Sequence, residues 1–168
     1  IKYCRTCVYP ETKPDLSLDK DGICEACRYV NVKDTTDWEA RRKELEEIFN
    51  DFNSKDGTNY DCVIPVSGGK DSHYQAHLLT KVFKMRPLFV TYNHAYNTKL
   101  GIRNLTNMLE KFGCDLLRYS TNPVTARKLS SFMLSKVGDI TWHYHAGIMT
   151  FPIQTAVRYK IPLIVWGD

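Results

Sequence analysis

The strongest guide to the fold of this chain is the alternation of short apolar runs with helix-like segments over residues 60–168. The predicted strands are Cys62–Val66, Pro87–Tyr92, Asp115–Tyr119 and Pro162–Trp166, and the predicted helices are Asp71–Lys84, Lys99–Phe112, Pro123–Lys136 and Ala146–Tyr159. Short strands that alternate with helices are typical of a parallel sheet with both faces covered. The sequence therefore predicts an α/β domain with a doubly wound parallel sheet, whose ligands bind beyond the carboxyl ends of the strands.

A glycine-containing loop follows the first predicted strand. Its residues are Ser67, Gly68, Gly69, Lys70, Asp71 and Ser72. Glycines let the backbone approach a ligand closely, and the unpaired amides at the start of the next helix favour a bound phosphate. Lys70 adds a positive charge, and Asp71 is a candidate magnesium ligand or a helix cap. The loop is neither a Walker A motif nor Gly-x-Gly-x-x-Gly, and an exposed turn without a ligand is the alternative interpretation.

The hexapeptide resembles the Ser-Gly-Gly-x-Asp-Ser hallmark of the PP-loop ATP pyrophosphatase superfamily. The resemblance implies that the loop binds ATP, with Lys70 and Asp71 in catalytic roles, and that ATP adenylates a carbonyl-type oxygen while pyrophosphate leaves. It also implies that the end of the second strand holds the adenine, at Thr91, Tyr92 and Asn93. Gly167 would contact the nucleotide after the last strand. Asp168 is a candidate magnesium ligand together with Asp71, and a cut end without a role is the alternative interpretation.

Four of the six cysteines form two Cys-x-x-Cys pairs near the start of the chain. Cys4 and Cys7 are followed, after sixteen residues, by Cys24 and Cys27. This spacing matches two zinc knuckles that present four thiolates to one tetrahedral ion. We expect a structural zinc-ribbon-like module over residues 1–31, because four thiolates leave no open position for catalysis. Two disulfides or reduced buried thiols are the alternatives.

The sequence predicts an amphipathic helix and a linker over residues 32–59. Thr36 and Glu39 have the spacing of a capping box. The apolar stripe of the helix over residues 36–52 consists of Leu45, Ile48, Phe49 and Phe52. The third predicted region, residues 60–168, is the ATP pyrophosphatase domain, and we expect it to continue beyond the last residue.

Further motifs, in order along the chain, extend the resemblance to one family. They are Tyr3-Cys-Arg-Thr-Cys7, Pro10-Glu-Thr-Lys-Pro14, Asp21-Gly-Ile-Cys-Glu-Ala-Cys27, Asp37-Trp38-Glu39, the segment from Asp61 to Ser72, Leu100-Gly101, Gly138-Asp139, His143 with His145-Ala-Gly147, and the segment from Pro162 to Gly167. This ordered set looks like the N-acetyl sugar amidotransferase family of surface-polysaccharide and nonulosonic-acid biosynthesis. The chain has Gly167-Asp168 where that family has Gly-Glu, which keeps a carboxylate at this position.

The family resemblance implies a specific reaction. ATP would adenylate the acetamido oxygen of an N-acetyl sugar, and ammonia would then displace AMP to leave an acetamidino group. The implied partners are a separate glutaminase and a cyclase-like subunit that supply the ammonia, in keeping with a chain whose cysteines do not lie in a glycine-rich elbow. The expected cofactors are ATP, Mg²⁺ and structural Zn²⁺.

Two histidines stand close together in the segment Trp142-His143-Tyr144-His145. In an extended segment, both side chains would point to the same side. The family resemblance implies that His143 and His145 act in catalysis by binding the sugar or orienting the activated amide. Without the resemblance, an exposed or hydrogen-bonded pair before a helix is the preferred interpretation.

Two other functions stay open. Enzymes that thiolate tRNA also join cysteine knuckles to a PP-loop, but their sulfur chemistry usually needs further cysteines after the loop, where this chain has only Cys114. A nucleotide-binding or zinc-ribbon interaction module without catalysis is the third possibility.

Charge and hydropathy add further expectations. The formal net charge of +4 comes from scattered basic residues, so nucleic acid is an unlikely partner unless the chain thiolates tRNA. The longest apolar runs are too short to cross a bilayer. We therefore expect a cytoplasmic protein without a membrane-inserted segment.

Overall fold

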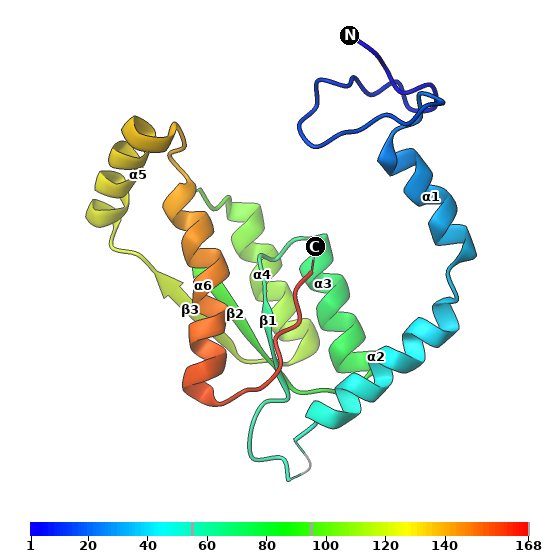
Figure 1. Ribbon diagram of the computed structural model, residues 1–168. Helices are drawn as coiled ribbons and strands as arrows, with labels where there is room; N and C mark the ends of the chain where they lie inside the picture. The colour runs from blue at the N-terminus through cyan, green and yellow to red at the C-terminus, as the bar shows by residue number, and fades with distance from the viewer. Residues whose placement is uncertain (55, 95, 168) are drawn as a thin grey trace. The chain divides into compact units, whose positions relative to one another are not determined.

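The computed structural model describes residues 1–54, 56–94 and 96–167 (Figure 1). The chain divides into two compact units, Ile1–Leu45 and Glu46–Asp168. The elements in order are α1 (Glu25–Thr35), α2 (Trp38–Phe52), β1 (Cys62–Pro65), α3 (Lys70–His77), the π-helix η1 (Leu78–Val82), β2 (Pro87–Asn93), α4 (Lys99–Phe112), β3 (Leu116–Ser120), α5 (Pro123–Val137) and α6 (Trp142–Tyr159). No helix in the described part of the chain has both the length and the apolar character needed to span a bilayer.

The three strands form a parallel sheet in the order β1-β2-β3. Cys62 pairs with Pro87 at the start of β1, and Phe89 pairs with Leu116 at the start of β3. Each strand is short and is followed by a helix that returns the chain to the amino-terminal edge of the sheet. This is the connection that parallel strands require.

The fourth predicted strand is reduced to a single parallel bridge between Ile164 and Val63, on the side of β1 away from β2. Val63 N–H donates to the carbonyl of Leu163, and Val165 N–H donates to the carbonyl of Val63, both at 2.9 Å. The segment after α6 therefore lies beside β1, and its continuation reaches the carboxyl end of the sheet.

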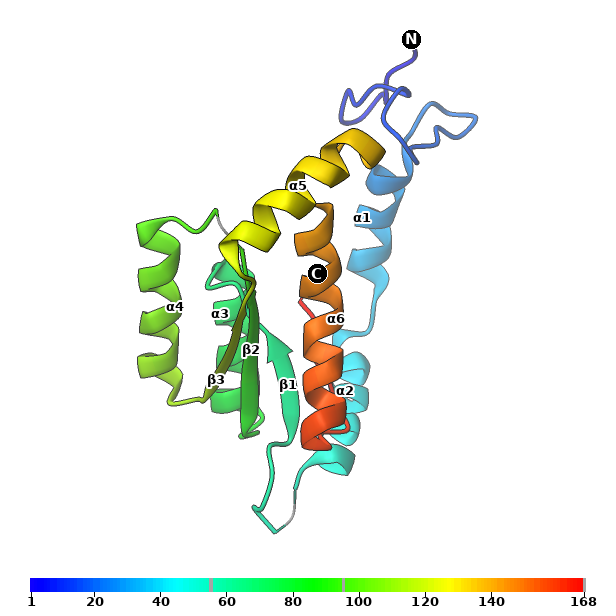
Figure 2. The ribbon, with the colours of Figure 1, turned by 90° about the vertical axis from the view of Figure 1, so that its left-hand side faces the viewer.

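Helices cover both faces of the sheet (Figure 2). The face toward α3 and α4 has a buried core of Phe49, Cys62, Ile64, Val66, Ala76, Leu79, Met85, Phe89, Met108 and Phe112. The face toward α6 has a smaller buried core of Val63, Leu88, Val90, Ala156 and Ile161. Because neighbouring residues of a strand point to opposite faces, an uninterrupted apolar strand fills both cores. The predicted doubly wound α/β fold is thus confirmed.

The two helices whose bounds were predicted most accurately, α4 and α5, begin at capping residues. Thr98 accepts the N–H of Gly101 at 3.0 Å at the start of α4, and Gly113 ends this helix in the left-handed conformation. Asn122 accepts the N–H of Val124 at 2.9 Å at the start of α5, which has Pro123 as its first residue. These are the residue types that helix ends prefer.

The predicted capping box at the start of α2 is wrong. Thr36 Oγ1 donates to the carbonyl of Val32, because a first helix, α1, occupies the residues just before it. Asp37 caps α2 instead and accepts the N–H of Ala40 at 2.9 Å. The helix α1 was not predicted, because the cysteine-rich segment shows little apolar periodicity.

Only one residue of the predicted α2 stripe is fully buried. Phe49 packs edge-on against Phe83, with ring centroids 4.8 Å apart. Leu45, Ile48 and Phe52 remain partly exposed. The end of α2 therefore joins the core of the second unit through Phe49.

The helix α6 begins at Trp142, four residues earlier than predicted. Asp139 Oδ1 accepts both the N–H and the hydroxyl of Thr141 and so forms a turn that leads into the helix. His143 and His145 are consequently helical, and residues two apart on a helix point about 200° apart. The expectation that both side chains share one side is wrong.

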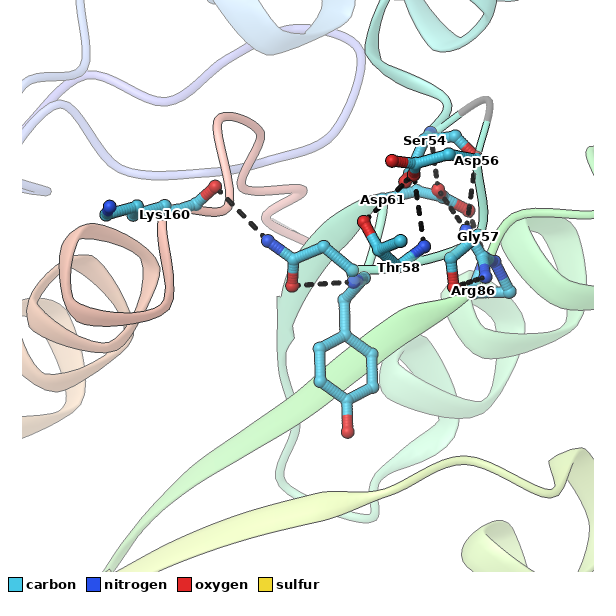
Figure 3. A network of polar contacts seen from close by, with 9 residues as sticks. Ser54, Asp56, Gly57, Thr58, Asp61, Arg86 and Lys160 are labelled. Carbon is cyan, nitrogen blue, oxygen red and sulfur yellow. Dashed lines mark hydrogen bonds and ion pairs between the residues drawn. The ribbon is translucent and has the colours of Figure 1, made fainter.

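A polar network ties the segment before β1 to the start of β2 (Figure 3). Asp61 is 1% exposed and accepts the N–H groups of Ser54 at 2.7 Å and of Arg86 at 2.6 Å. The Arg86 guanidinium lies 3.4 Å from the same carboxylate and also donates to the carbonyl of Gly57 at 2.8 Å. A buried carboxylate with these partners fixes the amino-terminal edge of the sheet, opposite the edge where ligands are expected.

Candidate functional site

A cleft of about 270 Å³ opens at the carboxyl ends of β1 and β2. Its walls come from the loop after β1, the end of β2, the first turns of α4, the middle of α6 and the segment that follows Ile164. Seven predicted site residues line it: Ser67, Asp71, Ser72, Thr91, Tyr92, Asn93 and Gly167. The fold thus brings together segments that are up to a hundred residues apart in the sequence, at the edge where parallel sheets bind ligands.

Gly68 holds the loop against α4. Its φ is +79°, and a Cβ at this position would lie 3.0 Å from the backbone nitrogen of Leu105. A side chain would be strained by the backbone conformation and would also push the loop away from the helix. The second glycine, Gly69, has an ordinary φ of −77° and is the residue before α3.

The two serines bind each other and the loop backbone. Ser67 N–H donates to Ser72 Oγ at 3.0 Å, the two hydroxyl oxygens are 3.3 Å apart, and Gly69 N–H donates to Ser67 Oγ at 3.3 Å. No side-chain hydrogen bond caps α3. The positive end of the helix is therefore left to an outside acceptor, which is the arrangement that favours a bound phosphate.

Lys70 and Asp71 form an exposed ion pair, with Nζ 2.7 Å from Oδ1. Asp71 lines the cleft, whereas Lys70 points into solvent with 88% of its side chain exposed. Asp71 offers a hard oxygen of the kind that Mg²⁺ prefers, so it fits the expected role of magnesium ligand. Asp168, the second predicted ligand, lies outside the described residues.

Sequence reasoning missed Arg118, which lines the cleft from β3. Its Nη2 donates to Asn93 Oδ1 at 2.7 Å and so places a cation across the end of β2. The available signal was a charged residue inside a predicted apolar strand, one position before its end. Such a residue is costly to bury and so tends to face a ligand or solvent.

Gln75 and Gly167 were not expected to meet, because ninety-two residues separate them in the sequence. A Cβ on Gly167 would lie 2.4 Å from the end of the Gln75 side chain, so any larger residue would require that flexible side chain to move. On α6, Pro152 also lines the cleft and has no N–H to give to the carbonyl of Ile148, another lining residue. That carbonyl is the kind of acceptor a nucleobase amino group needs.

His143 and His145 lie apart from the cleft lining in the described chain. His143 is 8% exposed, its Nε2 is 2.9 Å from Ser130 Oγ, and its ring packs on Tyr144 at 3.9 Å between centroids. It lines a separate cavity beside α6, whereas His145 is exposed. The catalytic roles of both remain predictions.

The four cysteines of the first unit gather at one point. Their sulfur atoms all lie within 4.8 Å of one another, with Cys4 3.9 Å from Cys27 and Cys7 3.6 Å from Cys24. A zinc ion with Zn–S bonds of about 2.3 Å separates its ligands by about 3.8 Å in a tetrahedron. The cluster therefore fits a tetrahedral metal of the zinc or iron type.

Hydrogen bonds in this cluster favour one thiolate over the others. Backbone amides of Cys7 and Cys24 lower the pKa of Cys4 to about 6, and Cys24 N–H donates to Cys4 Sγ at 3.3 Å. The hydrogen bond with Cys7 is the largest cause that raises the pKa of Cys27, to about 12. Four crowded thiols cannot all ionise together without a cation, because neighbouring negative charges oppose each further ionisation. A bound metal would supply that charge.

No family description matches the chain. It is 34% identical over 115 residues to an uncharacterized protein of Methanocaldococcus jannaschii, a match that covers 68% of this chain. The chain spans about two fifths (41%) of the length of that relative.

Two solved structures resemble part of the chain. The structure of NMN synthetase from Francisella tularensis matches 72% of this chain and 50% of its own, with a TM-score of 0.51 and 18% identity. An NH₃-dependent NAD synthetase from Campylobacter jejuni matches 76% of this chain and 56% of its own, with a TM-score of 0.49 and 10% identity. The chain accordingly has an α/β fold like that of the NMN synthetase structure, with a parallel sheet, and it carries a tetracysteine cluster that fits a metal.

Proposed function

We propose that this chain is an ATP-dependent, AMP-forming enzyme that adenylates an oxygen on a second substrate. The observation that carries the proposal is the cleft in which the Ser67–Ser72 loop, the end of β2 and Gly167 meet. The uncapped start of α3 suits the phosphates, and the apolar and backbone groups around Thr91 and Pro152 suit the adenine. Mg²⁺, held by Asp71, would neutralise the leaving pyrophosphate.

Lys70 has to move for this chemistry. Its ammonium now pairs with Asp71 at the surface, and a phosphate bound at the start of α3 would compete for it. Breaking the ion pair with Asp71 costs little free energy, since exposed ion pairs are weak. Lys70 would then stabilise the negative charge that develops as pyrophosphate leaves.

We further propose the acetamido group of an N-acetyl sugar as the oxygen donor, following the ordered motifs of the sequence. The amide oxygen attacks the α-phosphorus and pyrophosphate leaves. Ammonia then adds to the amide carbon, and AMP departs with the former amide oxygen, which leaves an acetamidino group. The ammonia would come from a separate glutaminase through a cyclase-like subunit in the cytoplasm.

The test is product analysis with ATP, ammonium and N-acetyl sugars labelled with ¹⁸O in the acetamido group. We expect AMP, pyrophosphate and an amidine, with the label recovered in the phosphate of AMP. Lys70→Gln should lower the rate about a hundredfold, as removal of a donor to a developing anion does elsewhere. Lys81→Gln, an exposed lysine about three helical turns further along the chain, serves as the matched control and should leave the rate unchanged.

The products separate the competing functions. Formation of ADP in place of AMP would reject the proposed chemistry altogether. AMP formation that depends on tRNA and a sulfur donor would indicate tRNA thiolation. Tight ATP binding without turnover under any of these conditions would indicate a nucleotide-binding module.

A further inference from the structure

A proline lies in the interior of α6. Proline is the residue that a helix interior tolerates least, because it removes one backbone hydrogen bond and its ring presses on the carbonyl four residues earlier. The helix nevertheless continues on both sides of Pro152. A residue that breaks a local rule in this way, without a local gain, is typical of functional sites.

The carbonyl that loses its helical donor belongs to Ile148. In an α-helix this carbonyl would accept the N–H of the residue four positions later, and Pro152 has no N–H. No side chain in the described part of the chain donates to it instead. The hydroxyl of Thr150, two residues further along, donates to the carbonyl of Ala146 at 2.8 Å. A carbonyl without a protein partner needs water or a ligand to satisfy it.

This carbonyl lies on the side of α6 that faces the cleft at the carboxyl ends of β1 and β2. Ile148 and Pro152 both line the cleft. Residues four apart on a helix lie one above the other on the same face. A helix carbonyl points along the axis toward the residue four positions later, so the gap in the hydrogen bonding of α6 lies between two residues of the lining.

The cleft joins the two faces of the sheet. The uncapped start of α3, which suits phosphates, lies on the face that α3 and α4 cover, whereas α6 covers the other face (Figure 2). On the α6 side the lining includes Val90, Ile148 and Pro152, which are apolar. A nucleotide held by its phosphates at α3 can therefore extend across the strand ends and place its flat base against this apolar lining.

Adenine and guanine differ in the group that they would present to a free carbonyl. Adenine carries an amino group, a donor, where guanine carries an oxygen, an acceptor. We infer that the Ile148 carbonyl accepts a hydrogen bond from the 6-amino group of the base, and that Pro152, by withholding an N–H, selects an adenine nucleotide. The inference rests on the proposed function for the presence of a nucleotide in the cleft. It adds a contact from α6 to those expected from the end of β2.

Binding of three nucleotides to the chain tests this assignment by calorimetry: ATP, GTP, and purine riboside triphosphate, which lacks the 6-amino group. The parent chain should bind purine riboside triphosphate about tenfold more weakly than ATP, the loss expected for one hydrogen bond whose acceptor is left unpaired. It should bind GTP more weakly still, because two acceptors would face each other.

Pro152→Ala supplies the missing N–H to the Ile148 carbonyl and should remove the preference. Its affinity for ATP should fall about tenfold, while its affinity for purine riboside triphosphate stays within about twofold, which also shows that the cleft is intact. Pro123→Ala is the matched control. Pro123 is the first residue of α5, where an N–H has no helical acceptor, so this variant should keep the preference of the parent chain.

Equal affinity of the parent chain for ATP and purine riboside triphosphate would overturn the inference, as would a Pro152→Ala chain that keeps the tenfold preference. Equal losses for both nucleotides in Pro152→Ala would also overturn it, since the proline would then act only on the shape of the cleft. AMP formation is measured separately. Formation of ADP by a chain that keeps the preference contradicts the proposed function and leaves the inference standing, whereas no binding of any of the three at millimolar concentration contradicts both.

Discussion

The approach of α6 to the sheet depends on Gly147. A Cβ at this position would lie 2.3 Å from Tyr92 Cζ. The Tyr92 ring is held from the other end, because its hydroxyl is 2.8 Å from Thr121 Oγ1. The absence of a side chain at Gly147 therefore lets α6 pack closely against Tyr92, which lines both the cleft and the separate cavity beside α6.

Gly147→Ala is expected to destabilise the fold by about 1–3 kcal/mol, the usual cost of overpacking. A loss of stability would be informative, because replacing glycine by alanine within a helix stabilises it by about 1 kcal/mol when nothing else changes. Urea unfolding of the full chain measures the difference. In a Tyr92→Ala background the same change should cost little, and an equal cost in both backgrounds would contradict the contact.

Among the elements, the connection between the linker and β2 has the clearest energetic basis. Asp61 takes two backbone N–H groups and one guanidinium, yet lies at the edge opposite the cleft. It aligns the starts of β1 and β2, from which both strands run to the ligand edge. Its contribution is thus to stability and strand alignment and not to ligand contact.

Asp61→Ala should lower the free energy of unfolding by about 3 kcal/mol, because it leaves buried amides without acceptors. Asp56→Ala removes an exposed carboxylate from the same network and should cost less than about 1 kcal/mol. Chemical denaturation measures both variants. Similar losses of unfolding free energy in the two variants would show that the contribution of Asp61 to stability does not come from its burial.

The whole molecule consists of two units with separate sources of stability. The first unit has a tetracysteine cluster and few buried side chains, whereas the second has the two cores on either side of the sheet. A unit with so small a core usually needs a metal to fold. The cleft at the carboxyl ends of β1 and β2, by contrast, is built from residues of the second unit alone.

Removal of the metal should therefore affect the first unit selectively. With a strong chelator at pH 8, the first unit should unfold and lose the contacts between cysteines that raise the pKa of Cys27. Iodoacetamide should then label Cys4, Cys7, Cys24 and Cys27, while affinity for ATP stays within about twofold. Burial raises the pKa of Cys62 to about 12 and that of Cys114 to about 11, so these thiols stay protonated at pH 8 and react slowly.

Intact-mass spectrometry counts the labels, and the untreated chain is the control. Rapid labelling of all four cluster cysteines before chelation would contradict a bound metal.

The buried thiols of Cys62 and Cys114 also predict how stability depends on pH. As pH rises above about 9, they ionise in the unfolded chain before they do so in the folded chain, so the free energy of unfolding should fall toward pH 11. A midpoint of unfolding that does not change over this range would contradict their burial.

Local patterns predicted much of the fold. The bounds of α4 agree with its periodicity and its end residues, and α5 differs by one residue. The predictions from local patterns were wrong where tertiary contacts outweigh local conformational preference. His143 lies in a helix because of a turn at Asp139, and Pro162–Trp166 forms one bridge where a full strand was expected. Arg118 was missed because a strand pattern does not reveal which side chains near the carboxyl end of a strand line a cleft.

The sequence alone determined the elements that depend on neighbours along the chain: apolar runs, end residues, the glycine loop and the cysteine spacing all act over a few residues. The tertiary structure decided which distant groups meet. Gln75 approaches Gly167, Asn93 pairs with Arg118, and His143 is among the residues that line the separate cavity beside α6. These contacts follow from packing between elements, which depends on the shape of the whole core and not on any one stretch of residues.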